Sequence, residues 1–315
     1  MPSTLPPSMS EALRLTREGK LTEATALLRG GAGGAEVKTP VSEDGLALTR
    51  YEGPAGTRDY RLFAPETARP GAPLIVMLHG CTQDAGGFAR GTRMNSLAEA
   101  KGAVVLYPEQ SRQENPQGCW NWFQAAHQEA RSGEAAILMG MIEQVAAAHG
   151  TGPVFVAGLS AGGAMAAILA ELFPERIEGI FVHSGLAAGA ARDLPSALAA
   201  MQQGGQDGPA AATPVPTLIF HGDADETVHP SNAERLAARA SGGARLTITE
   251  EEVFERGGRR CRVVTERAPE GRMLSERWTI IGAGHAWQGG DASGSHTDAR
   301  GPDASAEAMR FFFDL

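Results

Sequence analysis

The sequence predicts an α/β fold in which a mostly parallel central sheet carries helices on both faces. Two observations support this prediction. Short runs of consecutive apolar residues, such as 74–78 and 154–157, are flanked by turn-forming residues, as expected of parallel strands buried on both faces. Segments with helical spacing of apolar residues alternate with these runs, which is typical of a parallel sheet built from strand–helix units.

The elements are predicted in chain order from these patterns. The predicted strands are Leu46–Tyr51, Asp59–Phe63, Leu74–Leu78, Val104–Tyr107, Val154–Ala157, Gly179–His183, Thr217–Phe220, Leu246–Ile248 and Arg277–Ile281. The predicted helices are Phe88–Lys101, Ala135–His149, Ala164–Phe173, Asn232–Ala240 and Ala304–Phe313. The Gly- and Ala-rich stretch Ala187–Ala212 fits neither pattern, and we expect a surface insertion there.

The N-terminal segment differs from the rest of the chain. Ser8–Leu28 places leucines at helical spacing among charged residues, which predicts an amphipathic helix, and the run Gly30–Gly34 predicts a flexible linker after it. We therefore divide the chain into an N-terminal segment, 1–44, and a main domain, 45–315. We favour packing of the helix against the main domain over recruitment of a partner.

Composition and charge narrow the range of functions. The chain has 315 residues, 42% of them hydrophobic, and a formal net charge of −9. An acidic chain is poorly suited to nucleic acid, whose recognition needs clustered Lys and Arg. No run approaches the ~20 apolar residues of a membrane span. The N-terminus lacks the basic and apolar regions of a secretory signal, so we expect a cytoplasmic protein, or an extracellular one if the sequence is that of a mature form.

A nucleophile motif lies between a predicted strand and a predicted helix. Residues 158–162, GLSAG, match G-x-S-x-G with Ser160 at the centre. The strand–turn–helix setting is what this motif needs, because a sharp turn raises the serine hydroxyl above the sheet and glycines remove side chains that would clash. The motif in this setting predicts the α/β-hydrolase fold with Ser160 as the nucleophile.

A serine nucleophile needs a base and an acid, which follow it in that fold in the order acid, then histidine. The predicted strand Thr217–Phe220 leads into a loop with Asp223 and Asp225, of which we favour Asp225 as the acid and interpret Asp223 as a turn residue. His285 follows the last predicted strand across a glycine-rich loop and is the predicted base. An HG turn after Leu74–Leu78 points to the amides of Cys81 and Ala161 as oxyanion donors.

These segments together resemble the poly(3-hydroxybutyrate) depolymerase-like esterases, a group related to feruloyl and acetylxylan esterases. The resemblance runs from about Tyr51 to the C-terminus and rests on HGCTQ, GCWNWF, GLSAGG, HGDADETVHP and GAGHAWQGG, in the family's order. It implies an α/β-hydrolase fold, hydrolysis of short hydroxyacid polyesters or related esters, and no metal or organic cofactor. Matched position by position, it implies Ser160, Asp225 and His285 as the triad and Cys81 at the oxyanion hole.

The family motifs also contain cysteines and tryptophans. Cys81 and Cys119 lie in motifs that the family places beside the active site, which leaves open a bridge between them or two free thiols. The third cysteine is expected to be unpaired. The predicted substrate-binding residues are Trp287, Trp120 and Trp122, because aromatic walls suit apolar acyl or aryl groups, with core packing as the alternative for each.

The function predicted from the sequence is hydrolysis of a small or polymeric ester through an acyl-enzyme. Within the same class, a feruloyl or acetylxylan ester is the alternative substrate. A non-catalytic relative that only binds a ligand is the alternative class, and we disfavour it because all three triad residues are present. A peptidase is possible on chemistry alone, but the family motifs favour esters.

Overall fold

The computed structural model describes residues 46–205, 213–242 and 248–315 of the chain. The predicted N-terminal helix and linker lie outside these residues, as do the first two residues of the predicted strand Leu246–Ile248. Within the described part of the chain, no helix is long and apolar enough to cross a membrane.

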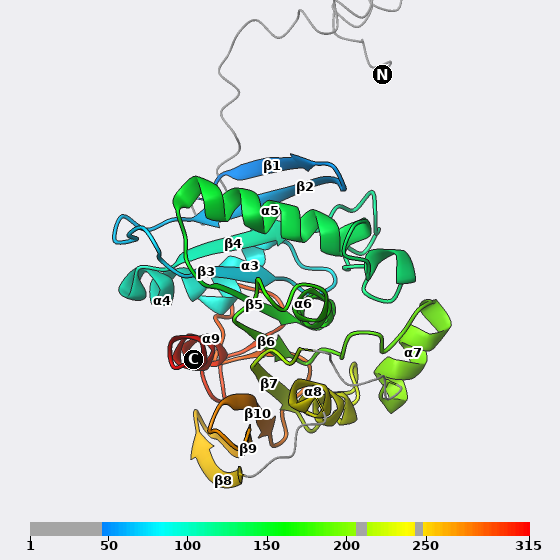
Figure 1. Ribbon diagram of the computed structural model, residues 1–315. Coiled ribbons are helices and arrows are strands. Elements are labelled where there is room, and N and C mark those ends of the chain that lie inside the picture. The colour runs from blue at the N-terminus through cyan, green and yellow to red at the C-terminus, as the bar shows by residue number, and fades with distance from the viewer. Residues whose placement is uncertain (1–45, 206–212, 243–247) are drawn as a thin grey trace, which may run out of the picture. The chain divides into compact units, whose positions relative to one another are not determined.

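A ten-stranded sheet forms the centre of the described part (Figure 1). Its strands are β1 Leu48–Gly53, β2 Gly56–Phe63, β3 Leu74–Leu78, β4 Val104–Glu109, β5 Val154–Leu159, β6 Gly179–His183, β7 Thr217–Gly222, β8 Ile248–Arg256, β9 Arg259–Arg267 and β10 Met273–Ile280. The strands β4-β3-β5-β6-β7-β10 are parallel neighbours. Antiparallel strands continue the sheet at both edges, with β2 and β1 beyond β4, and β9 and β8 beyond β10. The predicted, mostly parallel sheet is confirmed.

Helices cover both faces of this sheet. They are α3 Ala85–Thr92, α4 Met94–Lys101, α5 Gly133–His149, α6 Ala161–Leu172, α7 Leu194–Gln203, α8 Ser231–Ser241 and α9 Ala304–Phe313, with a short 3₁₀ turn at Ala125–His127. Side chains of α5, α6 and α8 share one buried cluster, and those of α3, α4 and α9 share the other. Alternate residues of β3 enter opposite clusters, Val76 one and Met77 the other, so this strand is buried on both faces.

The single helix predicted over Phe88–Lys101 is wrong, because the chain forms two helices there. Arg93 separates them with φ 54°, in the left-handed region, and its amide closes α3 on the carbonyl of Ala89. Its guanidinium donates hydrogen bonds to the Gly289 carbonyl at 2.6 Å and to Asp303 at 2.8 Å. The apolar spacing runs on across the break, so the spacing alone predicts one helix.

The sequence prediction missed most of the hairpin of β8 and β9, since the predicted strand Leu246–Ile248 reaches only the first residue of β8. The two strands pair along their length, and Gly257 and Gly258 turn the chain between them with φ of 58° and 71°. Charged residues dominate the pair, as in the ion pair of Arg262 and Glu251 at 2.8 Å. Strand prediction from apolar runs therefore finds little signal in this edge hairpin.

The prediction of a surface insertion over Ala187–Ala212 is confirmed for α7, most of whose residues are exposed, but it is wrong for the residues before α7. Ala187, Ala188, Ala190 and Ala191 are buried and pack in the core, and α7 follows them. Small alanine side chains give a weak apolar signal in the sequence, yet they allow close packing of the chain against its neighbours. Residues 206–212 lie outside the described part.

Candidate active site

Ser160 lies on the tight turn between β5 and α6. Its backbone has φ 56° and ψ −117°, a strained conformation for a residue other than glycine. The turn leaves no room beside it: a Cβ on Gly158 would overlap the backbone of Gly162, and a Cβ on Gly162 would overlap the carbonyl of Leu78. The Ser160 amide donates to the His183 carbonyl at 2.9 Å, which anchors the turn to β6.

His285 and Asp225 come from loops that follow neighbouring strands. β7 and β10 are parallel neighbours, so the loops at their carboxyl ends lie at the same edge of the sheet. The distance from His285 Nδ1 to Asp225 Oδ2 is 2.7 Å. The other carboxylate oxygen accepts hydrogen bonds from the amides of Thr227 and Val228, both at 2.9 Å. The Asp225 carboxylate is thus fully buried and held from two sides.

The two aspartates of this loop have different partners. Asp223 Oδ1 accepts a hydrogen bond from the Gly282 amide at 2.6 Å, and the Asp223 side chain is exposed. This hydrogen bond therefore connects the loop that carries both aspartates to the backbone three residues before His285. Asp225, and not Asp223, is the carboxylate in contact with the His285 ring.

The surroundings of Asp225 favour its ionised form. Burial acts to raise the pKa of this carboxyl group, but the hydrogen bond from His285, the His285 charge, the Val228 amide and the His221 charge together outweigh burial and lower the pKa below its ordinary value. A carboxylate that stays ionised beside an imidazole holds the ring in one orientation and stabilises its protonated form.

Ser160 and His285 line the same pocket, whose volume is about 480 Å³. Its wall consists of Gly80, Cys81, Thr82, Gln83, Gln117, Cys119, Trp122, Phe123, Leu159, Ser160, Leu194, Ala197, Leu198, Met201, Thr227, His285 and His296. Among the described residues, no hydrogen bond joins the Ser160 hydroxyl to the His285 ring. Hydrogen bonds of this kind are often long before substrate binds and tighten in the complex.

Two backbone amides beside the serine have no acceptor among the described residues. The amide of Gly80 donates to Gln83 Oε1 at 2.8 Å, and that of Thr82 donates to the Gln117 carbonyl at 2.7 Å. Between them the Cys81 amide makes no such bond, and neither does the Ala161 amide at the start of α6. Both amides are free to donate to an anionic oxygen, and that of Ala161 also lies at the N-terminus of α6, which favours negative charge.

A disulfide joins Cys81 to Cys119 and thereby links two walls of the pocket. Next to Cys119, the Asn121 amide donates to Glu134 Oε2 at 2.6 Å. Arg58 pairs with the same carboxylate at 3.2 Å, and the two side chains are almost completely buried. The loop that carries Cys119 and Trp122 is therefore held by a covalent bond and a buried ion pair. Cys261 is buried and has no disulfide partner.

The predicted cleft tryptophans differ in position. Trp287 is 1% exposed, its Nε1 donates to the Ser305 hydroxyl at 3.1 Å, and its ring packs against Phe88 and Phe181. Trp120 is fully buried, and its Nε1 donates to the His79 carbonyl. The prediction that these two line the cleft is wrong, because both have core packing and an internal hydrogen-bond acceptor. Trp122 lines the pocket.

Helix α7 contributes pocket residues that the sequence analysis missed. Leu194, Leu198 and Met201, which lie at helical spacing, line the pocket with Ala197. A helix signal was present in the sequence: Asp193 caps α7 by accepting the amide of Ser196 at 2.9 Å, and a proline stands in the first turn. This signal could have revealed α7 despite the weak apolar pattern around it.

His296 is a second missed residue of the pocket wall. It lies in a polar stretch of the sequence that contains no functional motif, although its side chain lines the pocket. Its backbone has φ 55°, in the left-handed region. Its carbonyl accepts the Trp287 amide at 2.7 Å, which places it close to the His285 loop. Burial and the charge of His285 lower the pKa of the His296 ring. The ring is thus biased toward its neutral form within the pocket.

The fold and this constellation define the chain as an α/β-hydrolase-type protein. Residues 59–253, more than half of the chain, match the family described as esterase PHB depolymerase, and the chain belongs to that family. The resemblance found in the sequence is thereby confirmed.

Individual relatives agree with the family match. Poly(3-hydroxyalkanoate) depolymerase C of Paucimonas lemoignei is 31% identical over 68% of the chain and 55% of that protein. Feruloyl esterase B of Neurospora crassa is 30% identical over 48% of the chain and 58% of that protein. The chain thus spans just over half the length of these relatives. The structure of acetyl xylan esterase from Aspergillus awamori superposes with a TM-score of 0.65 at 19% identity, covering 84% of this chain and 99% of that one, which shows a shared fold.

Proposed function

We propose that the chain is a serine carboxylesterase that hydrolyses short-chain hydroxyalkanoate polyesters, their oligomers or related short-chain esters. The observation that carries this proposal is the contact of His285 with the buried Asp225 at a pocket that Ser160 also lines. Membership of the esterase family supports the same chemistry. Among the described residues, no cluster of His, Cys, Asp and Glu could hold a metal ion, and the proposed reaction uses none.

The proposed reaction runs in two halves through an acyl-enzyme. Ser160 Oγ attacks the ester carbonyl carbon while His285 Nε2 takes the hydroxyl proton, and the amides of Cys81 and Ala161 bind the resulting oxyanion. The imidazolium, held by Asp225, gives the proton to the leaving alcohol as the C–O bond breaks. Water then repeats the sequence on the acyl-serine ester, with His285 again as base, and releases the carboxylic acid and free Ser160.

Replacement of the serine tests this mechanism. Ser160→Ala should lower kcat for p-nitrophenyl butyrate on the order of 10⁴- to 10⁶-fold, because the nucleophile is lost while binding remains. The same variant should no longer react with a fluorophosphonate probe. Ser241→Ala, which changes a serine on α8 outside the pocket wall, is the matched control and should keep both properties. Retained turnover by Ser160→Ala would exclude Ser160 as the nucleophile. A wild-type chain that neither turns over esters nor labels would favour the ligand-binding alternative.

A second candidate substrate is a plant cell-wall ester. The feruloyl esterase relative and the shared fold with an acetyl xylan esterase favour it. Three substrates separate the candidates: a 3-hydroxybutyrate oligomer, methyl ferulate and acetylated xylan. We expect the highest kcat/KM with the oligomer, since the depolymerase relative matches more of the chain than the feruloyl esterase does. A higher kcat/KM with methyl ferulate or acetylated xylan would replace the polyester proposal.

A further inference from the structure

Helix α7 presents apolar side chains both to the pocket and to the surface. Ala197 and Ala200 are buried against the core. On the outer side, Leu194 is 58% exposed and Leu198 is 51% exposed, although both also belong to the pocket wall. In Figure 1, α7 lies outside the two helical layers that cover the sheet. The apolar lining of the pocket therefore continues onto an accessible helical surface.

Exposed leucines of this kind are uncommon in the described part of the chain. Large apolar side chains exposed to a similar degree are few, and the others lie outside α7 and outside the pocket wall. Leu194 and Leu198 are one helical turn apart, so their side chains are neighbours on one face. Adjacent exposed apolar groups at the mouth of a pocket typically mark a binding surface.

Hydrogen bonds hold α7, which carries Leu194 and Leu198, beside the loop that carries Asp225. The Met201 carbonyl accepts the His229 amide at 2.7 Å, and the Ala200 carbonyl accepts Asn232 Nδ2 at 3.0 Å. His229 follows the loop that carries Asp225, so α7 is tied to the same element as the candidate acid. Because the backbone of α7 is already fixed in this way, less order has to be imposed on it when a ligand binds.

The chemistry of α7 indicates what it binds. Its sequence, LPSALAAMQQ, contains no charged residue. Such a surface offers no ion pair to an acidic or basic ligand and few hydrogen bonds to a sugar chain. It suits the aliphatic backbone of a neutral polyester, whose methylene and methyl groups gain from burial in proportion to their area.

From these observations we infer that Leu194 and Leu198 form an apolar platform that holds the aliphatic chain of a hydroxyalkanoate oligomer beyond the scissile ester. The platform makes the enzyme prefer esters whose aliphatic chain extends past the pocket. This inference rests on the proposed esterase function and adds to it the residues that set chain-length preference.

Paired substrates of different chain length test the platform. The double variant Leu194→Gln/Leu198→Gln replaces both leucines with polar side chains of good helix propensity. Its ratio of kcat/KM for p-nitrophenyl octanoate to that for p-nitrophenyl acetate should fall about tenfold, equivalent to about 1.4 kcal/mol. The same variant should lose a similar factor on a 3-hydroxybutyrate trimer relative to p-nitrophenyl acetate. Leu194→Met/Leu198→Met keeps an apolar surface and should keep the wild-type ratios.

A matched control separates a platform effect from a general loss of exposed leucine. Leu315→Gln makes the same change at a residue that is 49% exposed and outside the pocket wall, and its ratios should equal those of the wild type. Unchanged ratios in the double variant, or a fall shared by Leu315→Gln, would overturn the platform. Wild-type protein inactive on every ester would instead overturn the proposed function itself.

Discussion

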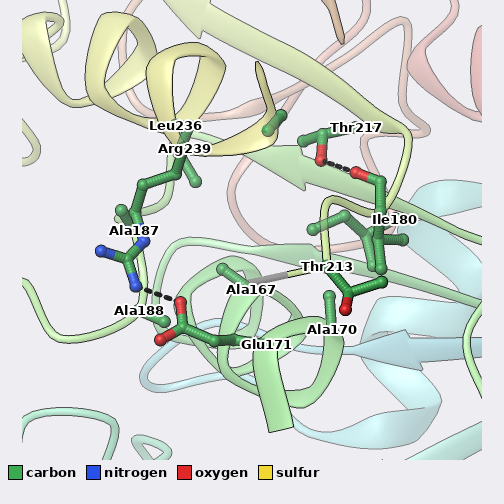
Figure 2. Close-up of a pocket in the computed structure, with 12 residues that line it drawn as sticks. Ala167, Ala170, Glu171, Ile180, Ala187, Ala188, Thr213, Thr217, Leu236 and Arg239 are labelled. Atoms are coloured by element: carbon green, nitrogen blue, oxygen red, sulfur yellow. Dashed lines mark hydrogen bonds and ion pairs between the residues drawn. The ribbon is translucent and has the colours of Figure 1, made fainter. Parts of the chain in front are cut away.

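Helix α6 borders two hollows of different character. Ser160 precedes its first turn and lines the candidate active-site pocket. Further along the helix, Ala167 and Ala170 line a second cavity of about 40 Å³, shown in Figure 2. Alanines and other small or aliphatic side chains make up most of the wall of this second cavity.

The two hollows differ in whether their polar groups already have partners. In the cavity of Figure 2, Glu171 pairs with Arg239, and the Thr217 hydroxyl donates to the Val215 carbonyl at 2.9 Å. In the pocket, the Ser160 hydroxyl makes no hydrogen bond to another described group, and neither do the nearby amides of Cys81 and Ala161. A hollow becomes a candidate site when such groups converge on it, because a substrate can then supply the missing partners.

The largest expected effect separates the two aspartates beside the pocket. Asp225→Asn should lower kcat for an ester about 10⁴-fold, since an amide no longer stabilises the protonated His285. Asp223→Asn makes the same change in the same loop but outside the His285 contact. The kcat of Asp223→Asn should stay within about tenfold of the wild type, because this change only weakens the hydrogen bond to Gly282 in the loop before His285. Equal losses in the two variants would contradict the assignment of Asp225.

The next largest effect concerns the free energy of unfolding and compares two ion pairs, the buried pair of Arg58 and Glu134 and the partly exposed pair of Arg239 and Glu171. Glu134→Gln leaves the buried Arg58 without its ionic partner and should lower the free energy of unfolding by about 3–5 kcal/mol. Glu171→Gln breaks the partly exposed pair with Arg239 at the cavity, and its cost should be about 1 kcal/mol or less. Urea unfolding of both variants provides the comparison. A larger loss in Glu171→Gln than in Glu134→Gln would show that burial does not decide these contributions.

A pH effect is expected beneath the pocket, where His183 is fully buried next to the Ser160 turn. Burial, with the charges of His221 and His285, lowers the pKa of His183 to about 3. In the unfolded chain the ordinary value of 6.5 applies, so between about pH 6.5 and 3 the unfolded chain binds a proton that the folded chain does not. The free energy of unfolding should therefore fall by a few kcal/mol as the pH drops through this window, at about 1.4 kcal/mol per pKa unit.

Variants of histidine isolate this contribution. His183→Gln cannot titrate, and its free energy of unfolding should fall less steeply between pH 6.5 and 3 than that of the wild type. His149→Gln changes an exposed histidine at the end of α5 and should keep the wild-type slope. Urea unfolding at several pH values measures the slopes. Identical slopes in His183→Gln and the wild type would rule out His183 as the source.

The smallest expected effect concerns the cavity of Figure 2. Ala170→Val adds apolar atoms to its wall, and each buried CH₂ contributes about 0.8 kcal/mol, partly offset by the lower helix propensity of valine. We expect a gain of about 1 kcal/mol in the free energy of unfolding. Ester turnover should stay at the wild-type level, because the cavity and the pocket share no lining residue. A drop in turnover would mean that the two hollows are coupled through α6.

Local sequence patterns were sufficient for the core of the fold. β3, β6 and α9 have the bounds that the apolar runs and helical spacing predict. The turn around Ser160 was equally predictable from its G-x-S-x-G motif. Gly158 is required by the backbone of Gly162, which is close in sequence, whereas Gly162 is required by the carbonyl of Leu78 on the neighbouring strand β3. The hairpin of β8 and β9 was not predictable in this way, since its charged strands are stabilised by pairing with each other and with β10.

The sequence by itself determined the α/β fold, the serine turn and the chain order of the candidate triad, because each depends on neighbouring residues or on strand order. The sequence also favoured Asp225 over Asp223 as the acid, and the tertiary structure supplied the physical reason, since Asp225 contacts the His285 ring whereas Asp223 accepts the Gly282 amide. Only the tertiary structure placed Trp287 in the core and Leu198 at the pocket mouth. The burial of a side chain and its contacts depend on segments that are far apart in the chain, so they cannot be predicted from local sequence patterns.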